Sequence, residues 1–222
     1  MALEKIEIDI PIKAGLHLPA ILCVPPGADA MVIFSHGSGS SRYSVRNNVV
    51  AGMLNKERIA TLLTDLLTED EDTIYENRFD IDLLSNRLAE VTEYIHQSTE
   101  FSKFRLGYFG ASTGSASALQ AAARLHPLIR AIVSRGGRPD LAWDALPSVQ
   151  APTLLIVGTL DEDVLALNEQ AFALLECHKK LELVAGASHL FEEPGKLELV
   201  SELAKNWFTE FLRLPSASKI NA

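Results

Sequence analysis

Cysteine is scarce in this chain, with two residues among 222. Cys23 and Cys177 stand far apart and form no C-x-x-C pair, so the sequence offers neither a disulfide framework nor a thiolate zinc site. A chain of this length buries a sizeable core without such cross-links. The scarcity of cysteine therefore favours a reducing compartment.

Long apolar runs are absent as well. No stretch reaches the roughly 18 apolar residues that a membrane-spanning helix needs. The first residues carry acids where a secretory signal would carry positive charge. We therefore expect a cytoplasmic protein that does not enter a membrane.

Basic residues are outnumbered by acidic ones. Twenty lysines and arginines stand against 29 aspartates and glutamates, giving a formal net charge of -9 at pH 7. Such a surface repels nucleic-acid phosphates and anionic lipid headgroups, so we expect neither as a partner. The acidic run Glu69-Asp-Glu-Asp72 is interpreted as a solvated loop.

Short apolar segments recur along the chain, most of them bounded by turn residues. The first two, Ile6 to Ile12 and Leu16 to Val24, predict an antiparallel hairpin at a sheet edge. Beyond them, strand-length and helix-length segments alternate. The later predicted strands are Met31 to Phe34, Ile59 to Leu63, Arg105 to Phe109, Ala131 to Ser134, Thr153 to Val157 and Leu181 to Val184. The predicted helices are Asn47 to Lys56, Phe79 to Gln97, Ser115 to Leu125, Val164 to Glu176 and Leu197 to Leu212.

This alternation predicts an α/β fold, in which helical crossovers join parallel strands and cover both faces of an eight-stranded sheet. No repeat or linker divides the chain, so we expect one domain over residues 1–214 and a flexible tail over residues 215–222. Between Gly136 and Pro152 there is room for a short helix but not for a large lid. In such sheets, ligands bind where strands end and helices begin.

The segment Gly110-Ala-Ser112-Thr-Gly114 lies between a predicted strand and a predicted helix. A G-x-S-x-G sequence in this setting is typical of a nucleophile elbow, a sharp turn that exposes the serine hydroxyl and leaves no room for side chains beside it. Ser112 would then lie at a helix N-terminus, which favours developing negative charge. The plainer alternative is a glycine-rich turn whose serine caps the helix.

A serine hydroxyl needs a base to take its proton and an acid to orient that base. His189 lies in the loop after the last predicted strand, and Asp161 follows the strand before it. Asp163 competes with Asp161 for the acid role, although an aspartate just before a helix is a common N-cap. The order Ser112, Asp161, His189 is the one expected of the α/β-hydrolase arrangement.

Acyl transfer also needs hydrogen-bond donors for the oxyanion that forms on the attacked carbonyl. The first parallel strand runs into the segment Ser35-His-Gly-Ser-Gly-Ser-Ser-Arg42, whose backbone N–H groups can approach a substrate closely. We expect one donor at the backbone of Thr113 and the second at Ser38 or Gly39. His36 is interpreted as structural.

Four segments resemble the dienelactone hydrolase-like α/β-hydrolases, and more narrowly the small bacterial hydrolases sometimes fused to a phosphoribosyltransferase domain. They are the H-G-S-G-S-S-R loop, the G-A-S-T-G elbow, the S-R-G-G-R-P-D-L segment from Ser134 to Leu141 and the S-H-L-F-E-E-P-G loop. The resemblance implies a Ser or Cys nucleophile acting with Asp and His, an eight-stranded sheet whose second strand is antiparallel, and no cofactor. The best-studied members carry cysteine at the elbow, where this chain has Ser112.

Three arginines, Arg42, Arg135 and Arg138, lie on the predicted rim of the site. Guanidinium groups hold anions by paired hydrogen bonds, so these residues can bind an anionic small-molecule substrate. Pairing with Asp140 and neighbouring acids is the structural alternative. We expect a serine hydrolase that acts on small ester, thioester or lactone substrates through an acyl-enzyme, without a metal or cofactor.

Two other functions fit parts of the sequence. Gly107, Gly110 and Gly114 after a strand can form a dinucleotide-binding turn, with Arg135 accepting the 2′-phosphate of NADP. That interpretation assigns no role to the downstream Asp and His. A non-catalytic α/β-hydrolase scaffold that only binds a ligand is the second, because a fold does not guarantee activity.

Overall fold

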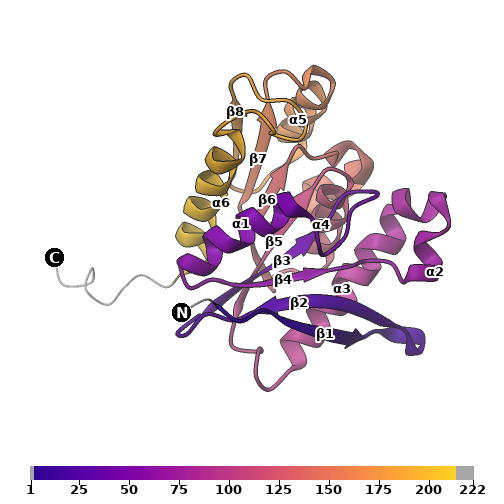
Figure 1. Ribbon diagram of the computed structural model, residues 1–222. Helices are drawn as coiled ribbons and strands as arrows, with labels where there is room; N and C mark the ends of the chain where they lie inside the picture. The colour runs from indigo at the N-terminus through magenta and orange to yellow at the C-terminus, as the bar shows by residue number, and fades with distance from the viewer. Residues whose placement is uncertain (1–2, 214–222) are drawn as a thin grey trace.

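A computed structural model describes residues 3–213, and its centre is an eight-stranded sheet with helices on both faces (Figure 1). The strands are β1 (Ile6–Pro11), β2 (His17–Cys23), β3 (Ala30–Ser35), β4 (Ala60–Thr64), β5 (Arg105–Ala111), β6 (Ile129–Arg135), β7 (Thr153–Gly158) and β8 (Lys179–Val184). The helices are α1 (Val45–Lys56), α2 (Glu69–Asp72), α3 (Ile81–Gln97), α4 (Thr113–Arg124), α5 (Glu162–Leu174) and α6 (Lys196–Leu212). Short 3₁₀ helices are η1 (Lys13–Gly15), η2 (Tyr75–Phe79) and η3 (Pro139–Ser148).

The strands lie in the order β1-β2-β4-β3-β5-β6-β7-β8. β2 is antiparallel to both of its neighbours, whereas the strands from β4 to β8 in this order are parallel. Parallel strands are covered on both faces, which is why every residue of β3 is buried and its sequence shows no alternation. The predicted fold, mostly parallel with an antiparallel second strand, is confirmed.

The core has two halves, one on each face of the sheet (Figure 1). Helices α1 and α6 cover one face, and α3, α4 and α5 cover the other. Neighbouring residues of β5 contribute to different halves: Tyr108 packs with the α3 and α4 side, and Phe109 packs with the α1 and α6 side. Both faces therefore hold β5 in place, and the end of β5 is where the predicted elbow begins.

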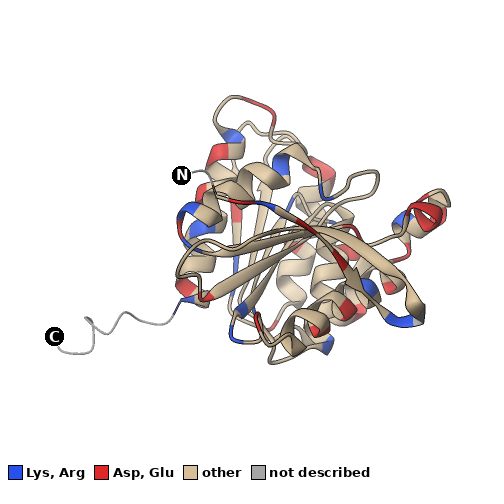
Figure 2. Ribbon diagram, turned by 60° about the horizontal axis from the view of Figure 1, so that its bottom comes forward, with Lys and Arg blue, Asp and Glu red and all other residues tan. Residues whose placement is uncertain are grey.

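The segment between β4 and α3 differs from the prediction. The run Glu69–Asp72 forms helix α2 rather than a loop, because Thr68 and Glu71 make a reciprocal capping box with each other's backbone N–H groups. Figure 2 shows these acidic residues on a helix that projects from the body of the molecule. α3 begins at Ile81 rather than Phe79, because the Asp80 side chain accepts the N–H of Leu83.

Residue 214 and the predicted tail over 215–222 lie outside the described residues, so the division into a domain and a tail stays a prediction. The segment after β6 is the short helix η3, in agreement with the expected absence of a large lid. Across residues 3–213, every helix is too short or too polar to cross a bilayer.

Candidate active site

Ser112 occupies a strained turn between β5 and α4. Its backbone has φ 52° and ψ -123°, a conformation that costs a non-glycine residue on the order of 1–3 kcal/mol. The N–H of Ser112 donates to the carbonyl of Arg135 at 3.2 Å, and its own carbonyl accepts the N–H of Arg138 at 3.0 Å. The segment after β6 therefore holds the turn in its strained form.

The glycines beside Ser112 are required by packing. A side chain at Gly110 would begin 2.5 Å from the Cα of Ser115, and one at Gly114 would begin 2.2 Å from the carbonyl oxygen of Ser35. Both spaces are thus filled by the protein's own backbone.

Asp161 and His189 meet at the carboxyl end of the sheet. Asp161 Oδ2 and His189 Nδ1 are 2.7 Å apart and form a hydrogen bond. Asp161 precedes α5 but makes no capping bond with its side chain, which turns to the histidine instead. Asp163, the competing acid, is exposed in the first turn of α5. The structure thus brings together the favoured acid and the predicted base.

The loop that carries His189 is fixed at two further points. Glu193 Oε1 accepts the N–H of Ser188 at 3.0 Å. Phe191 has φ 56° and is 1% exposed, so its ring anchors the loop in the core formed with α1 and α6. No general sequence pattern identifies Glu193 as an anchor, so it is not among the predicted site residues.

Ser112 and His189 approach the same stretch of backbone after β6. Ser112 is bonded to Arg135, and a side chain at the next residue, Gly136, would begin 3.5 Å from Nδ1 and Cε1 of His189. Within residues 3–213 the imidazole is hydrogen-bonded to Asp161 and not to Ser112. Catalytic hydrogen bonds often shorten only when substrate binds, so the missing bond between His189 and Ser112 does not exclude His189 as the base.

The loop after β3 lies against the elbow. A side chain at Gly37 would begin 3.0 Å from the Cβ of Ser112, a close approach that the sequence analysis did not single out. Ser38 donates its backbone N–H to the Thr113 hydroxyl at 2.8 Å. Gly39 has φ 68°, a backbone conformation that favours glycine. Thr113 begins α4, so its own N–H is one of the helix donors that lack an intrahelical partner.

His36 faces its own loop and a neighbouring acid. Its Nδ1 lies 2.9 Å from the carbonyl oxygen of Gly37, and its Nε2 lies 3.9 Å from Asp65 Oδ1. Within residues 3–213, His, Cys, Asp and Glu side chains form no group of three or more that could hold a metal ion.

The three predicted arginines differ in their partners. Arg42 is hydrogen-bonded to Asp65 through its backbone N–H and its guanidinium. Arg138 makes two bonds of 2.8 Å to the Asp140 carboxylate. Arg135, by contrast, forms no ion pair within residues 3–213, and its Nε and Nη1 are buried without a hydrogen-bond partner. Burial and the positive charge of Arg46 lower the pKa of Arg135 to about 10, so it stays charged at neutral pH.

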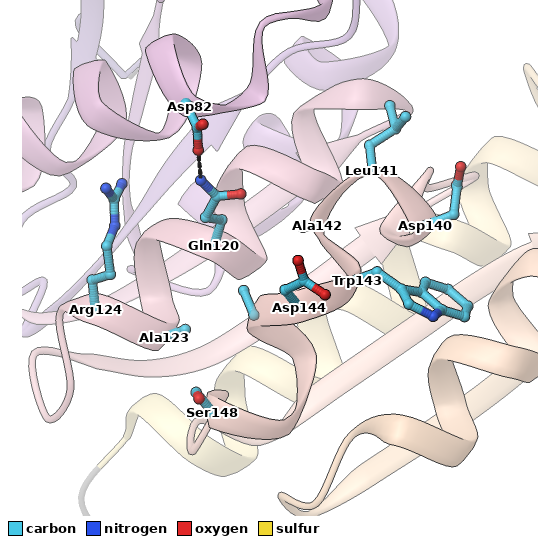
Figure 3. Close-up of a pocket in the computed structure, with 11 residues that line it drawn as sticks. Asp82, Gln120, Ala123, Arg124, Asp140, Leu141, Ala142, Trp143, Asp144 and Ser148 are labelled. Atoms are coloured by element: carbon cyan, nitrogen blue, oxygen red, sulfur yellow. Dashed lines mark hydrogen bonds between the residues drawn. The ribbon is translucent and has the colours of Figure 1, made fainter.

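A cavity of about 660 Å³ lies elsewhere, along the flank of α4 (Figure 3). It is lined by the second half of α4, the start of α3 and η3, and Asp82 accepts a hydrogen bond from Gln120 across it. None of the predicted site residues lines it. An open groove of about 450 Å³ lies nearer the elbow, between the loop after β3 and the pair formed by Asp72 and Arg78.

Comparison with solved structures shows that the chain is similar to known hydrolases. The chain is 47% identical in sequence to a dienelactone hydrolase from Anabaena variabilis ATCC 29413, with a TM-score of 0.93. The match covers 96% of this chain and 100% of that protein's crystallised chain. Est1E from Butyrivibrio proteoclasticus has a TM-score of 0.79 at 19% identity over 92% of this chain and 98% of its own, which shows the fold alone.

Comparison with curated proteins adds two Mycobacterium tuberculosis relatives, from strains CDC 1551 and H37Rv, that are provisionally named phosphoribosyl transferases. Each is 52% identical to this chain over 197 residues, which is 89% of this chain and 44% of the relative. The chain therefore spans less than half the length of these curated relatives. No family model matches the sequence.

Proposed function

Because the chain belongs to the dienelactone hydrolase family of α/β-hydrolases, we propose that it is a serine hydrolase with Ser112, His189 and Asp161 as its catalytic triad. The observation that carries the proposal is the 2.7 Å hydrogen bond between His189 and Asp161, beside a strained serine turn. A base oriented by an acid is what a serine hydroxyl needs to become nucleophilic.

In the first half of the proposed reaction, Ser112 Oγ forms a bond to the carbonyl carbon of the substrate, and its proton passes to His189 Nε2. The carbonyl π electrons move onto oxygen. When they return, the bond to the leaving group breaks, and the leaving alcohol or thiol takes the proton from His189. The product is an acyl-enzyme on Ser112.

In the second half, water attacks the acyl carbon while His189 Nε2 takes a proton from it. Collapse of the second tetrahedral intermediate returns that proton to Ser112 and releases the acid. Asp161 accepts the Nδ1–H of His189 throughout and stabilises the imidazolium. No step requires a metal or cofactor.

The proposed substrates are small esters, thioesters or lactones. Of the three arginines predicted to bind an anionic substrate, we propose Arg135 as the residue that binds it. Arg42 and Arg138 are already paired with acids, whereas among the described residues the buried guanidinium of Arg135 has no acidic partner. Arg135 is also bonded to the Ser112 turn through its backbone. A substrate carboxylate would complete its hydrogen bonds.

Labelling by a fluorophosphonate probe, which reacts with activated serines, tests the proposed function. We expect the wild type to be labelled and Ser112→Ala to be unlabelled. His189→Ala should lose labelling within short incubations because the hydroxyl then lacks its base. Ser102→Ala, at an exposed serine that precedes β5 whereas Ser112 follows it, is the control and should label like the wild type. A wild type that resists the probe and hydrolyses no p-nitrophenyl ester would refute the proposal.

A series of p-nitrophenyl esters tests the size of the acyl group. We expect acetate and butyrate to be turned over faster than long-chain esters, because the segment after β6 is a short helix rather than a large lid that could cover a long chain. Faster turnover of long-chain esters would contradict the small-substrate part of the proposal.

A further inference from the structure

The Thr113 hydroxyl accepts the backbone N–H of Ser38, which is one of the two predicted second donors to the oxyanion. Ser38 donates its backbone N–H to Thr113 Oγ1 at 2.8 Å, a well-formed hydrogen bond. A backbone N–H carries a single proton, so while this bond is intact Ser38 has none to give to a substrate. The second donor must therefore be Gly39, the other predicted donor, or a group that the sequence did not indicate.

Thr113 can supply that donor itself. A threonine hydroxyl has one proton and two acceptor positions, and Ser38 occupies one of the acceptor positions. Within residues 3–213 the hydroxyl proton of Thr113 has no acceptor, although the residue is only 4% exposed. A buried donor without a partner is costly, so a substrate oxygen within hydrogen-bond distance of the hydroxyl would be bound favourably.

The hydroxyl is also in the right place. Thr113 follows Ser112 directly, and Gly37, the neighbour of Ser38, lies so close that a side chain there would begin 3.0 Å from the Cβ of Ser112. The pair formed by Ser38 and Thr113 thus bridges the loop after β3 and the elbow. The Thr113 hydroxyl therefore lies at the junction of the two segments that meet beside Ser112.

We propose that the side-chain hydroxyl of Thr113 donates a hydrogen bond to the oxyanion, together with the backbone N–H of the same residue. This inference rests on the proposed serine hydrolase function. As Ser112 Oγ bonds to the carbonyl carbon, the π electrons move to the carbonyl oxygen, and the Thr113 O–H points to that charge. The hydrogen bond from the Ser38 N–H to Thr113 Oγ1 polarises the hydroxyl and makes the hydroxyl a stronger donor.

Variants that differ by one group at position 113 test the proposal. Thr113→Val keeps the shape of the side chain and removes the hydroxyl. Thr113→Ser keeps the hydroxyl, and Thr113→Ala differs from Thr113→Ser only by its loss. Loss of an oxyanion donor lowers kcat by roughly 100-fold or more in other enzymes. We expect a loss of that size for Thr113→Val, with KM within about threefold of the wild-type value, and near wild-type kcat for Thr113→Ser. If the Val variant does not fold, the kcat values of the Ser and Ala variants still compare the enzyme with and without the hydroxyl.

Inhibition by a trifluoromethyl ketone distinguishes two roles of the Thr113 hydroxyl: a hydrogen-bond donor to the oxyanion, or a purely structural contact with Ser38, called here a latch. It forms an anionic adduct with the serine, so its inhibition constant should rise in Thr113→Val in step with the loss of kcat/KM. A latch would change the melting temperature or KM instead. Thr99→Val, at an exposed threonine, is the matched control.

The outcomes are distinct from those of the proposed function. If the wild type is labelled and hydrolyses esters but Thr113→Val keeps or exceeds its kcat, a backbone N–H such as that of Ser38 or Gly39 is the second donor and the inference is wrong. The inference also fails if Thr113→Ser is as slow as Thr113→Ala. If the wild type itself is inert, the proposed function fails first.

Discussion

Glu193 accepts the backbone N–H of Ser188, the residue just before His189, through its Oε1 at 3.0 Å. Hydrogen bonding with the side chain of Ser188 contributes most to lowering the pKa of Glu193 below its ordinary value of 4.5, and the backbone N–H of Ser188 lowers it further. A carboxyl whose pKa is lower in the folded than in the unfolded protein stabilises the fold at neutral pH. The loop carrying the proposed base is therefore held by an ionised side chain.

Glu193→Gln should destabilise the protein in a pH-dependent way. The stabilisation is complete above the unfolded pKa of about 4.5 and is lost as pH falls through the lower folded pKa. Chemical denaturation should show the wild type to be more stable than Glu193→Gln at pH 7, with the difference vanishing in acid. Glu192→Gln removes an exposed pair with Arg46 and is the control. An equal difference at pH 3 and pH 7 would rule out the charge as the cause.

A pair of buried hydroxyls joins β3 to α4 beneath the elbow. Ser35 Oγ and Ser117 Oγ are 2.7 Å apart, and Ser117 donates to the carbonyl of Gly114 at 3.0 Å. Ser35 is therefore the donor between the two. Ser117→Ala should cost about 1–3 kcal/mol of unfolding free energy, because it leaves the Ser35 hydroxyl buried without an acceptor.

Removing both hydroxyls should cost less than the sum of the single changes, because no group is then left unpaired. Urea denaturation of Ser35→Ala, Ser117→Ala and the double variant gives the three values. Strict additivity would show that the two hydroxyls do not depend on each other.

The sheet was predictable because its signal is periodic and local. Strand-length apolar segments alternate with helix-length ones, and handed crossovers leave few ways to assemble them. The elbow was predictable for a similar reason, since Gly110 and Gly114 are needed by packing within a few residues of Ser112. Helix α2 was missed because a single capping box between Thr68 and Glu71 outweighs four adjacent acids.

The contacts that complete the site were beyond the sequence. That Asp65 holds Arg42 and that Ser38 bonds to Thr113 depends on distances between segments far apart in the chain. The same is true of Arg135, which differs from the other two arginines in having no acidic partner in the part of the chain that the structure describes. A sequence can show which residue types are available at the rim, but not which of them are already paired.

Gly37→Ala should impair catalysis while leaving the fold intact. The added methyl group would lie 3.0 Å from the Cβ of Ser112 and 3.1 Å from the carbonyl oxygen of Ala111, so the loop must move by a few tenths of an ångström. We expect kcat on p-nitrophenyl acetate to fall by about 10-fold or more, because oxyanion donors act only at short range.

Gly52→Ala is the matched comparison for that substitution. Gly52 lies within α1 and has no atom within 4 Å of the added methyl group, so the change should raise unfolding free energy by about 0.5–1 kcal/mol without affecting activity. Wild-type kcat in Gly37→Ala would show that the contact with Ser112 is not tight in solution.

Arg135→Met should stabilise the protein and weaken its discrimination in favour of anionic substrates. Arg135 is 7% exposed and its guanidinium has no acidic partner within residues 3–213. Such a charge is costly to bury, so removing it should raise unfolding free energy by about 1–3 kcal/mol. Activity on p-nitrophenyl hemisuccinate should fall at least 10-fold more than on the neutral acetate ester, since a bidentate partner for the carboxylate is gone.

Arg138→Met provides the control, because its guanidinium is paired with Asp140 at the surface and its loss should change stability by less than about 1 kcal/mol. If Arg135→Met lowered stability and left the ratio of the two ester activities unchanged, the buried guanidinium would support the fold rather than a substrate. A stabilised variant with reduced activity on the anionic ester would instead show that the protein retains an unfavourable buried charge for the sake of binding.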